Sequence, residues 1–450
     1  MMENTIDDFK KFINDHKESA QEIFSSLHPA DIADIIEQLS DDKKKEIFNR
    51  LNSDLASEVI VEMDDQTREY ILEDITTEKL ADIVEEMNSD DAANLIRDLP
   101  DEDVDNLLKE LDEDDSEELR RILKYDPESA GGIMQTEIFS VREGMLVEDV
   151  VVKFIAEAED IGEVGDIHNV YIVNADGVLV GSTPIANLLL HKPTTPIAAF
   201  MDKSVVTVNV HMDQEEVARI FEKYDIISAA VVDDDNRLLG RILVDDIVDV
   251  IDEEASEDML KIAGIYRDEH IFDPPVQSVQ LRFPWLVFNL ITAVMAASIV
   301  GYFGDAISSF VVLAAFMPII AGMGGIAGSQ ALAVTIRGIA LGELDAGNGR
   351  KAVYNAALAG ALSGLITGVL TAAVAYVWKK NIIFTMIIFA TMFLNVFIGT
   401  LFGVLIPIIL KKVKIDPAAS SAVFLTTFTD CLGFFALLGL STLLIKHLVH

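Results

Sequence analysis

One charged residue, Asp430, lies near the middle of an apolar stretch close to the C-terminal end of the chain. The stretch reads SAVFLTTFTDCLGFFALLGL over residues 421–440, which is long enough to cross a bilayer. An ionised carboxylate that faces lipid at that depth costs about 2.5 to 3.5 kcal/mol. No Lys, Arg or His lies at a comparable depth in the apolar stretches to pair with it. We therefore expect Asp430 to face protein or water.

A cation site is the chemistry that this carboxylate and its neighbours suit best. If two chains pack about a two-fold axis along this segment, their Asp430 carboxylates converge beside the hydroxyls of Thr426 and Thr427. A divalent ion would offset the repulsion between the two acids. Mg²⁺ prefers octahedral oxygen ligands and keeps several waters, which fits so sparse a set. The alternative is a protonated Asp430 that hydrogen-bonds Thr426 or a neighbouring helix.

A second group of acids lies at residues 245–258, where eight of the fourteen side chains are Asp or Glu. Asp246, Asp249, Glu253 and Glu257 follow a spacing that places them on one helical face. Like charges one turn apart destabilise a helix, so something must compensate them. Hard oxygen ligands suit Mg²⁺, and we therefore expect a helix that depends on cations. The alternative is a solvated acidic linker.

Five apolar stretches of about 20 residues or more follow residue 275, and each is adequate for a bilayer about 30 Å thick. We expect membrane spans at residues 283–303, 308–336, 352–378, 382–410 and 417–445. If the N-terminal part is cytosolic, seven basic residues flank the spans inside and three outside, which supports that orientation. The inner set is Arg282, Arg337, Arg350, Lys351, Lys411, Lys412 and Lys414, and the outer set is Lys379, Lys380 and Lys446.

Small residues crowd the second and third of these stretches. Gly324 with Gly328, Gly360 with Gly364, and Gly364 with Gly368 are each spaced four apart, as in closely packed membrane helices. The first glycine cluster is not a dinucleotide-binding loop, because no βα unit surrounds it. We expect tight helix packing, or a glycine-loosened helix that lines a pore.

A repeat in two copies occupies the middle of the chain. Residues 171–189, YIVNADGVLVGSTPIANLL, align position for position with residues 230–248, AVVDDDNRLLGRILVDDIV. Each copy predicts a strand, an Asp or Asn turn, a strand, a Gly, a strand and a helix start, and each follows a strand and an amphipathic helix. The pattern resembles a tandem CBS pair, a module that often senses adenosyl nucleotides or metal and commonly dimerises.

The two CBS-like copies differ at the acid that can hold a ribose in that family. The second copy has Asp246 at this helix start, whereas the first copy has Asn187. Two equal nucleotide sites are therefore not expected, and ATP or a related nucleotide at one cleft is the option that the resemblance leaves.

The N-terminal part, up to residue 130, contains a repeat of twelve. The repeat consists of octets whose fourth and eighth residues are apolar. The fifth residue is apolar as well, except at Arg120. The octets start at residues 20, 32, 44, 56, 68, 80, 92, 104 and 116. This is the pattern of a short amphipathic helix, and Ser, Asn or Asp between the octets can cap the next one. We expect short helices stacked as a superhelix with acidic outer faces, suited to a scaffold or moving lid. A plain helical adaptor is the alternative.

The charge divides the chain in two. Its 450 residues carry a formal net charge of −41, yet residues 281–450 hold ten basic and five acidic side chains, so the net charge before them is −46. Such acidity argues against nucleic acid as a partner and suits metal cations. The N-terminus lacks the features of a signal peptide, so we place the acidic part in the cytosol. Cys431 is the one cysteine, so no intrachain disulfide is expected.

Two stretches of the membrane half carry a family resemblance. Residues 318–343 read PIIAGMGGIAGSQALAVTIRGIALGE and residues 415–434 read IDPAASSAVFLTTFTDCLGF. Together with the order helical repeat, CBS pair, acidic helix and five spans, they closely resemble the MgtE family of magnesium transporters. The resemblance implies a homodimeric, Mg²⁺-selective channel with its pore at the dimer interface. Asp430 then matches the pore ion-binding aspartate, and Asp416 matches the acid at the cytosolic mouth.

The resemblance also implies feedback, in which cytosolic Mg²⁺ draws the acidic domains together and closes the pore. The matching acids are Asp246, Asp249, Glu254, Glu257 and Asp258 on the connecting "plug" helix, Asp213, Glu215 and Asp225 in the second CBS copy, and Asp91 in the helical domain. The family pattern has Asn where this chain has Ile326 and Ser329, and a common Pro appears as Val423. The loss of the Asn residues changes polar contacts near the pore, and the loss of the Pro changes a helix kink. Selectivity among divalent ions is therefore expected to differ from the family pattern.

The sequence thus predicts a multidomain α + α/β membrane protein. The expected domains are a helical repeat at 1–130, CBS motifs at 131–198 and 199–244, an acidic plug helix at 245–275 and a five-helix pore domain at 276–450. We expect a Mg²⁺ channel for uptake across the plasma membrane, with the C-terminus outside and no enzymatic activity, since no catalytic constellation is present. The alternatives are a cation-coupled carrier of Mg²⁺ or Co²⁺, and a membrane-anchored CBS sensor that conducts nothing.

Overall fold

The computed structural model describes Phe24 and residues 27–157, 167–265, 269, 271, 274–344, 347–418 and 421–444. The side chains of residues 101 and 421 lie outside this description, as does most of the first predicted octet at 20–27. The chain divides into two compact units, Met1–Ile251 and Asp252–His450, and each is described by itself.

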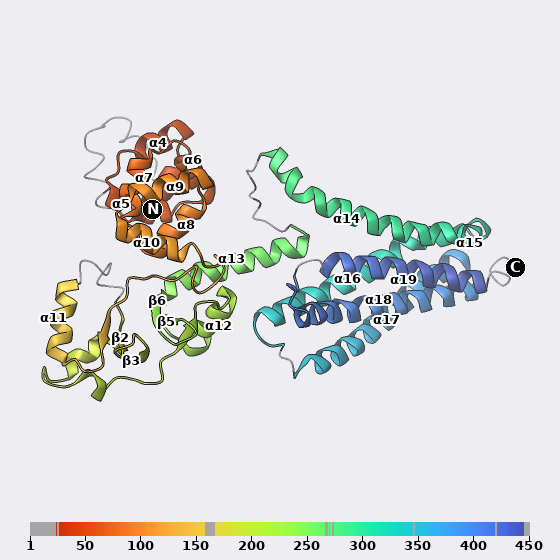
Figure 1. Ribbon diagram of the computed structural model, residues 1–450. Coiled ribbons are helices and arrows are strands. Elements are labelled where there is room, and N and C mark those ends of the chain that lie inside the picture. The colour runs from red at the N-terminus through yellow and green to blue at the C-terminus, as the bar shows by residue number, and fades with distance from the viewer. Residues whose placement is uncertain are drawn as a thin grey trace. The chain divides into compact units, whose positions relative to one another are not determined.

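Eight described helices follow one another in the N-terminal part of the first unit, and their first residues are spaced twelve apart (Figure 1). They are α3 (Pro29–Glu37), α4 (Asp41–Phe48), α5 (Ser53–Val61), α6 (Asp65–Leu72), α7 (Thr77–Val84), α8 (Ser89–Arg97), α9 (Asp101–Glu110) and α10 (Glu113–Ile122). The predicted repeat of short helices is confirmed, and the helices begin between the octets. Each helix begins three residues before the octet, because a capping residue such as Asp64 or Thr76 starts it there.

The eighth, apolar position of each octet lies beyond the helix end. Leu51, Met63 and Leu111 at these positions are buried, and Leu39 packs against the same core, so the turns contribute to the core as the helices do. The helices pack in two rows, since α3 contacts α5, α5 contacts α7 and α7 contacts α9, while α4 contacts α6 and α8 contacts α10. Each element can therefore bury its apolar face only with its neighbours in place.

The rest of the first unit contains two small sheets with the same topology. The first contains β1 (Ser140–Arg142), β2 (Asn169–Val173) and β3 (Leu179–Pro184), and the second contains β4 (Thr207–Asn209), β5 (Ser228–Val232) and β6 (Leu238–Leu243). In each, the first pair is parallel and the second antiparallel, and each has a register shift at equivalent places, after Ile172 and after Val231. The helices α11 (Val147–Glu157) and α12 (Gln214–Tyr224) follow the first strands, so the predicted two-copy repeat is confirmed.

Two details of the predicted CBS pattern were wrong. One strand runs through Gly181 and one through Gly240, where separate strands were expected. The glycines allow close approach of other chain segments, because an added Cβ would lie 2.9 Å from the Asp202 carbonyl oxygen or 2.6 Å from that of Gln135. The first copy also ends in two 3₁₀ turns, η2 (Ile185–Leu190) and η3 (Ile197–Ala199), where an α-helix was expected. Pro193 and Pro196 disfavour an α-helix in this segment.

The second copy leads into a continuous helix, α13 (Val244–Ala263), which contains the acidic residues 245–258. Ile247 and Val250 anchor its first half in the core of the second sheet. The acidic stretch is therefore helical here.

Five helices in the described part of the second unit are long and apolar enough to span a membrane. They are α14 (Pro275–Tyr302), α16 (Val312–Ala340), α17 (Gly349–Lys379), α18 (Ile382–Lys412) and α19 (Ser421–Leu443), with the short α15 (Gly304–Ser309) between the first two. The number of predicted spans is confirmed. Several ends differ from the prediction, because the helices continue past the apolar run into the polar flanks.

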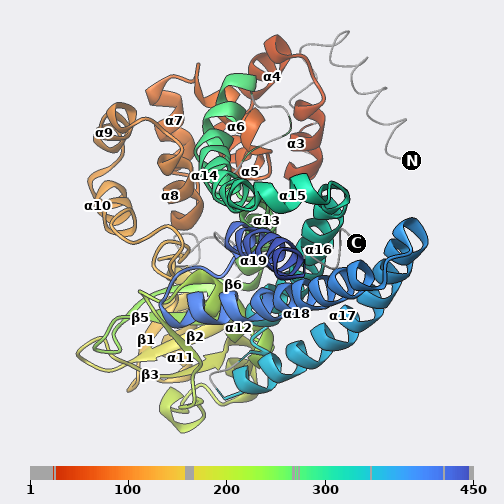
Figure 2. The same ribbon diagram turned by 90° about the vertical axis from the view of Figure 1, so that its right-hand side faces the viewer.

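The helix α18 is the centre of this unit, since α16, α17 and α19 all pack on it, and α17 and α18 run side by side in two views (Figures 1 and 2). An added Cβ on Gly399 or Gly403 would collide with a carbonyl oxygen of α16, at Gly324 and Gly328 respectively. Backbones thus touch where glycines face each other, as predicted for the α16 pair. The spacing of Gly399 and Gly403 was the same signal, and it was missed.

On another side of α18, three phenylalanines face the glycines of α17. Phe389, Phe393 and Phe397 lie one turn apart, and adjacent ring centroids are 6.3 Å apart. An added Cβ on Gly364 would lie 2.7 Å from the Phe393 carbonyl oxygen, and one on Gly368 would lie 3.2 Å from the Phe389 ring. The glycine face of α17 is therefore filled by this phenylalanine row.

We expect Gly364→Ala to lower the Tm of the detergent-solubilised protein. The new methyl group meets backbone, which cannot move without shifting a helix, and overpacking of this kind costs about 1–3 kcal/mol. The measurement is the amount of monodisperse protein on size exclusion after heating to a series of temperatures. Gly301→Ala in α14 is the matched control, because nothing lies within 4 Å of an added Cβ there. Equal melting of the two variants would contradict the packing described for α17 and α18.

Candidate functional site

Asp430 lies in the third turn of α19, the last of the long apolar helices. Its side chain is half-buried, and no Lys, Arg or hydroxyl in the described part of the chain forms an ion pair or hydrogen bond with it. The alternative in which Thr426 bonds Asp430 is therefore not observed. The carboxylate lies on the helix surface without a partner from the described residues.

The hydroxyls beside Asp430 donate their protons along their own helix. Thr426 Oγ1 and Thr427 Oγ1 both donate to the Val423 carbonyl oxygen, at 3.1 and 2.7 Å, and Thr429 Oγ1 donates to the Leu425 carbonyl at 3.1 Å. A hydroxyl that donates in this way still offers its oxygen lone pairs to a cation. Thr426 is exposed on the surface of α19, whereas Thr429 is buried.

A residue that the sequence reasoning missed, Asn395, lies between three of these helices. It is 1% exposed in α18, and its Nδ2 donates to the Ile320 carbonyl of α16 at 2.7 Å. An added Cβ on Gly433 of α19 would lie 3.0 Å from the same amide, so Asn395 also packs against the turn after Asp430. A polar residue in an apolar helix was the available signal. Its hydrogen bond joins α18 to α16, and the same amide packs against α19.

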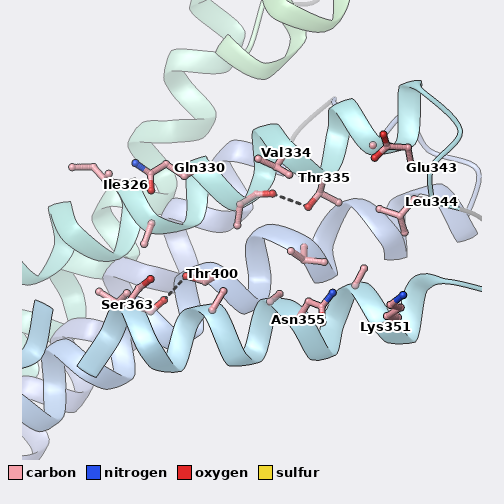
Figure 3. A pocket seen from close by; sticks show the side chains of 18 of the residues that line it. Ile326, Gln330, Val334, Thr335, Glu343, Leu344, Lys351, Asn355, Ser363 and Thr400 are labelled. Carbon is pink, nitrogen blue, oxygen red and sulfur yellow. Dashed lines mark hydrogen bonds between the residues drawn. The ribbon is translucent and has the colours of Figure 1, made fainter. Parts of the chain in front are cut away.

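A groove with a cavity volume of about 950 Å³ lies between α16 and α17, over α18 (Figure 3). Glu343 and Lys351 lie at one end of it, and Ile326, Gln330 and Ser363 lie toward the other. Neither Asp430 nor Asp416 lines this groove. Ile326, one departure from the family pattern, is exposed and lines this groove.

Asp416 lies in the turn that joins α18 to α19. Its Oδ1 accepts a hydrogen bond from the Ala418 backbone at 2.8 Å, and its Oδ2 lies 2.9 Å from Lys261 Nζ. Asp416 thus precedes the first turn of α19, whereas Asp430 lies in the third turn. The structure therefore places the two predicted pore acids at different depths along one segment.

In the first unit, buried acids gather at the first turn of α8. The Glu137 carboxylate accepts from the Ser89 backbone and hydroxyl, both at 2.9 Å, and so caps the start of the helix. Asp90 is 3% exposed, and its Oδ2 accepts from Gln135 Nε2 at 3.3 Å, while its Oδ1 accepts no hydrogen bond from the described residues. Asp91 follows in the same turn.

The first half of α13 brings further acids close to this turn. Burial and the charge of Asp90 raise the pKa of Asp91 to about 8, with Asp249 and Asp245 among the further causes. Burial and the charge of Asp90 likewise raise the pKa of Asp246 to about 9. Asp91, which was predicted in the helical domain, and Asp246 and Asp249, which were predicted on the plug helix, therefore lie close enough to interact. Asp90, Glu137 and Asp245 belong to the same cluster and were not predicted.

The three acids predicted in the second CBS copy lie at opposite ends of α12. Asp213 caps the start of the helix by accepting from the Glu215 backbone at 3.0 Å, and Glu215 pairs with Arg219 at 2.5 Å. Asp225 ends the helix in a left-handed conformation. A helix of eleven residues separates these groups by about 16 Å. The chain therefore does not bring Asp213 and Asp225 to one site.

Glu254, Glu257 and Asp258 lie on the second half of α13, in the second unit. Among the described residues, no group of three or more His, Cys, Asp or Glu is arranged to hold a metal ion.

Comparisons with known proteins match both halves of the chain. Residues 317–440 match the MgtE family, described as divalent cation transporter, residues 27–128 match the MgtE intracellular N domain, and residues 197–253 match the CBS domain. A magnesium transporter MgtE from Bacillus subtilis is 34% identical over 73% of this chain and 72% of its own length. One from Thermus thermophilus is 31% identical over 72% of each chain.

Two solved structures resemble the N-terminal part. The soluble part of a magnesium transporter is 28% identical and covers 57% of this chain and 100% of its own, with a TM-score of 0.52. The cytosolic domain of the Mg²⁺ channel MgtE in complex with ATP is 30% identical and covers 54% of this chain and 97% of its own, with a TM-score of 0.50.

We expect Asp246→Asn to raise the Tm of the protein in buffer with EDTA. In the folded protein the pKa of Asp246 is raised to about 9, whereas its ordinary pKa is 3.8. Between these pH values the folded state keeps a proton that the unfolded state releases. Stability at this position therefore falls as pH rises from about 4 to 9. The asparagine does not titrate, and the gap between variant and wild type should widen between pH 6 and 9.

The matched control is Asp252→Asn, because Asp252 is exposed on the same helix. Added Mg²⁺ should raise the Tm of the wild type more than that of Asp246→Asn. If the wild type and Asp246→Asn had the same Tm at pH 9 without divalent ions, ionisation of Asp246 would not destabilise the fold, and the prediction would be wrong.

Proposed function

Because the chain belongs to the MgtE family of magnesium transporters, we propose that this Mg²⁺ transporter is a Mg²⁺-selective channel that mediates uptake across the plasma membrane. It is a multi-pass membrane protein with five spans and a cytosolic N-terminal domain, and it is not an enzyme. The observation that carries the channel proposal is the position of Asp430. This acid lies within an apolar helix long enough to span a membrane, and the described residues supply no partner for it.

The proposed pore lies between two copies of the chain, with the C-terminus outside. Paired Asp430 carboxylates repel each other in a medium of low dielectric, and a divalent cation between them removes that repulsion. Thr426 supports this proposal, because its hydroxyl is exposed beside the acid and keeps an oxygen lone pair for a hydrated ion. Asp416 would attract cations at the cytosolic mouth. Mg²⁺ would keep most of its water, since each chain offers few ligands.

We propose further that cytosolic Mg²⁺ closes this pore. The cluster of Asp91, Asp246 and Asp249 supports the proposal, because acids whose pKa values are raised by burial and mutual repulsion gain most from a bound cation. Glu254, Glu257 and Asp258 lie on the part of the same helix that belongs to the second unit, and Asp213, Glu215 and Asp225 add charge from α12. Cation binding to α13 would thus couple cytosolic Mg²⁺ to the pore.

The CBS pair is proposed as a second ligand site, for ATP or a related nucleotide. The relative whose cytosolic domain was solved in complex with ATP supports this proposal. The two copies are unequal, since Asn187 donates to Thr183 Oγ1 at 3.2 Å, whereas the equivalent Asp246 accepts from the Leu243 backbone at 3.1 Å. One nucleotide per chain is therefore the expected stoichiometry.

Asp430→Asn should abolish Mg²⁺ flux and leave the protein folded. The amide keeps the shape of the side chain but removes the charge that attracts the ion. The measurement is Mg²⁺ entry into liposomes that contain purified protein and a Mg²⁺-sensitive dye. Asp305→Asn, at an exposed acid of α15, is the control and should conduct as the wild type does. Wild-type flux through Asp430→Asn would refute the pore assignment, and no flux through the wild type would favour a non-conducting sensor.

Neutralising Asp246, Asp249, Glu254 and Glu257 together should raise the cytosolic Mg²⁺ concentration that closes the pore. Fewer charges gain from bound cations, so closure is less favourable. Single-channel recording from excised patches measures both open probability and unitary current. Currents far above the turnover of a carrier would exclude ion exchange. Unchanged inhibition by Mg²⁺ in this variant would count against the gating proposal.

A further inference from the structure

The end of α13 is fixed to the membrane helices through a short run of residues, Lys261 to Gly264, within the second unit. Each contact of this run uses a different physical interaction. Lys261 forms ion pairs, Ile262 packs in an apolar cluster, and Gly264 allows an aromatic ring to lie against the backbone.

Lys261 lies between two carboxylates. Its Nζ is 2.9 Å from Asp416 Oδ2 and also pairs with Glu257 one turn back on α13. The Lys261 side chain is 19% exposed and that of Asp416 is 35% exposed, so the pair is partly shielded from water and salt. Burial lowers the pKa of Lys261, but the hydrogen bonds to Glu257 and Asp416 outweigh burial and raise it above its ordinary value. Lys261 is therefore held by two carboxylates at once, one on its own helix and one before α19.

The neighbouring contacts hold the same helix end in place. Ile262 packs against a cluster that includes Leu332 of α16 and Leu425 of α19. Gly264 has a φ of +86°, and an added Cβ there would collide with the indole ring of Trp285 in α14. Only glycine satisfies both the backbone conformation and the close ring. The pairing of Lys261 with Asp416 is thus one part of a defined interface.

We propose that Lys261 is a built-in cation that holds the end of α13 at the proposed cytosolic mouth, by bridging Glu257 and Asp416 without a bound divalent ion. The inference rests on the proposed function, because it assigns a positioning role to a residue next to the mouth acid Asp416. An ammonium within hydrogen-bonding distance of both carboxylates neutralises most of their repulsion, which is what a bridging metal would do.

This bridge gives the two halves of α13 different roles. Glu257 and Asp416 were expected as metal ligands, but here their shared partner is Lys261, and Mg²⁺ would have to displace the ammonium to join them. The dependence on Mg²⁺ then belongs mainly to the first half of the helix, where Asp91 and Asp246 lie close to other acids. The second half of α13 is held at the mouth even when Mg²⁺ is low.

Acylation of lysines by a water-soluble N-hydroxysuccinimide acetate tests the bridge directly. The full-length protein in detergent and EDTA is labelled for a series of times, and modification of each lysine is read by mass spectrometry. Lys261 should react about tenfold more slowly than the exposed Lys411 of α18, because its ammonium is held by two carboxylates and is largely shielded from the reagent. In the Glu257→Gln/Asp416→Asn double variant, the rate at Lys261 should approach that at Lys411.

Two results of this experiment would overturn the inference. One is fast labelling of Lys261 in the wild type. The other is protection of Lys261 that appears only when Mg²⁺ is added, because the bridge would then require a divalent ion. Neither result depends on conduction, so a failure of the proposed channel activity is distinguishable from a failure of the bridge.

The functional readout is the Mg²⁺ concentration for half-closure in patches. Lys261→Met should raise it several-fold, whereas Lys261→Arg, which keeps the charge, should stay near the wild type. Adding Asp416→Asn to Lys261→Met should produce no further rise in that concentration. Lys411→Met is the matched control and should leave the concentration unchanged. Closure of Lys261→Met at the wild-type concentration would show that the bridge does not position α13.

Discussion

The cost of an uncompensated carboxylate in a medium of low dielectric governs both units of this protein. In the membrane unit the constraint acts on Asp430, which the described residues leave without a partner while the neighbouring hydroxyls donate to their own helix. A helix that keeps such an acid must expose it to water or to a cation. Close packing holds α18 against its neighbours, because glycines meet the backbone of α16 and the Asn395 amide lies between α16 and α19.

The same cost acts on the acids of the first unit, where several buried carboxyls lie close together. Asp90 and Asp91 start α8, and Asp246 approaches them from α13, so each raises the pKa of another. The start of a helix favours negative charge, but only by about 0.3 to 1 kcal/mol, which does not offset several buried acids. A proton or a cation must complete the cluster. The far end of α13 needs neither, since Lys261 supplies the positive charge there.

Sequence periodicity predicted the elements better than their contacts. The two internal repeats and the five apolar stretches follow from burial patterns, which local sequence carries directly. The octets did not show where each short helix ends, because apolar residues such as Leu51 and Met63 continue the core through the turns. Long-range juxtapositions, such as Glu137 at the start of α8 or Lys261 beside Asp416, could not be predicted, since they depend on how distant elements pack. Asn395 and the pair Gly399 and Gly403 were visible as polar and small residues in an apolar helix.

The two rows of short helices limit how the N-terminal domain can change its length. Contacts join α3, α5, α7 and α9 in one row, and join α4 with α6 and α8 with α10 in the other, so neighbours in sequence alternate between rows. A chain that lost a single repeat unit would move every later helix into the opposite row, where its apolar stripe would meet the wrong partner. Loss or gain of two adjacent units together would keep every later helix in its own row. Insertions and deletions tolerated by this domain should therefore come in pairs of helices.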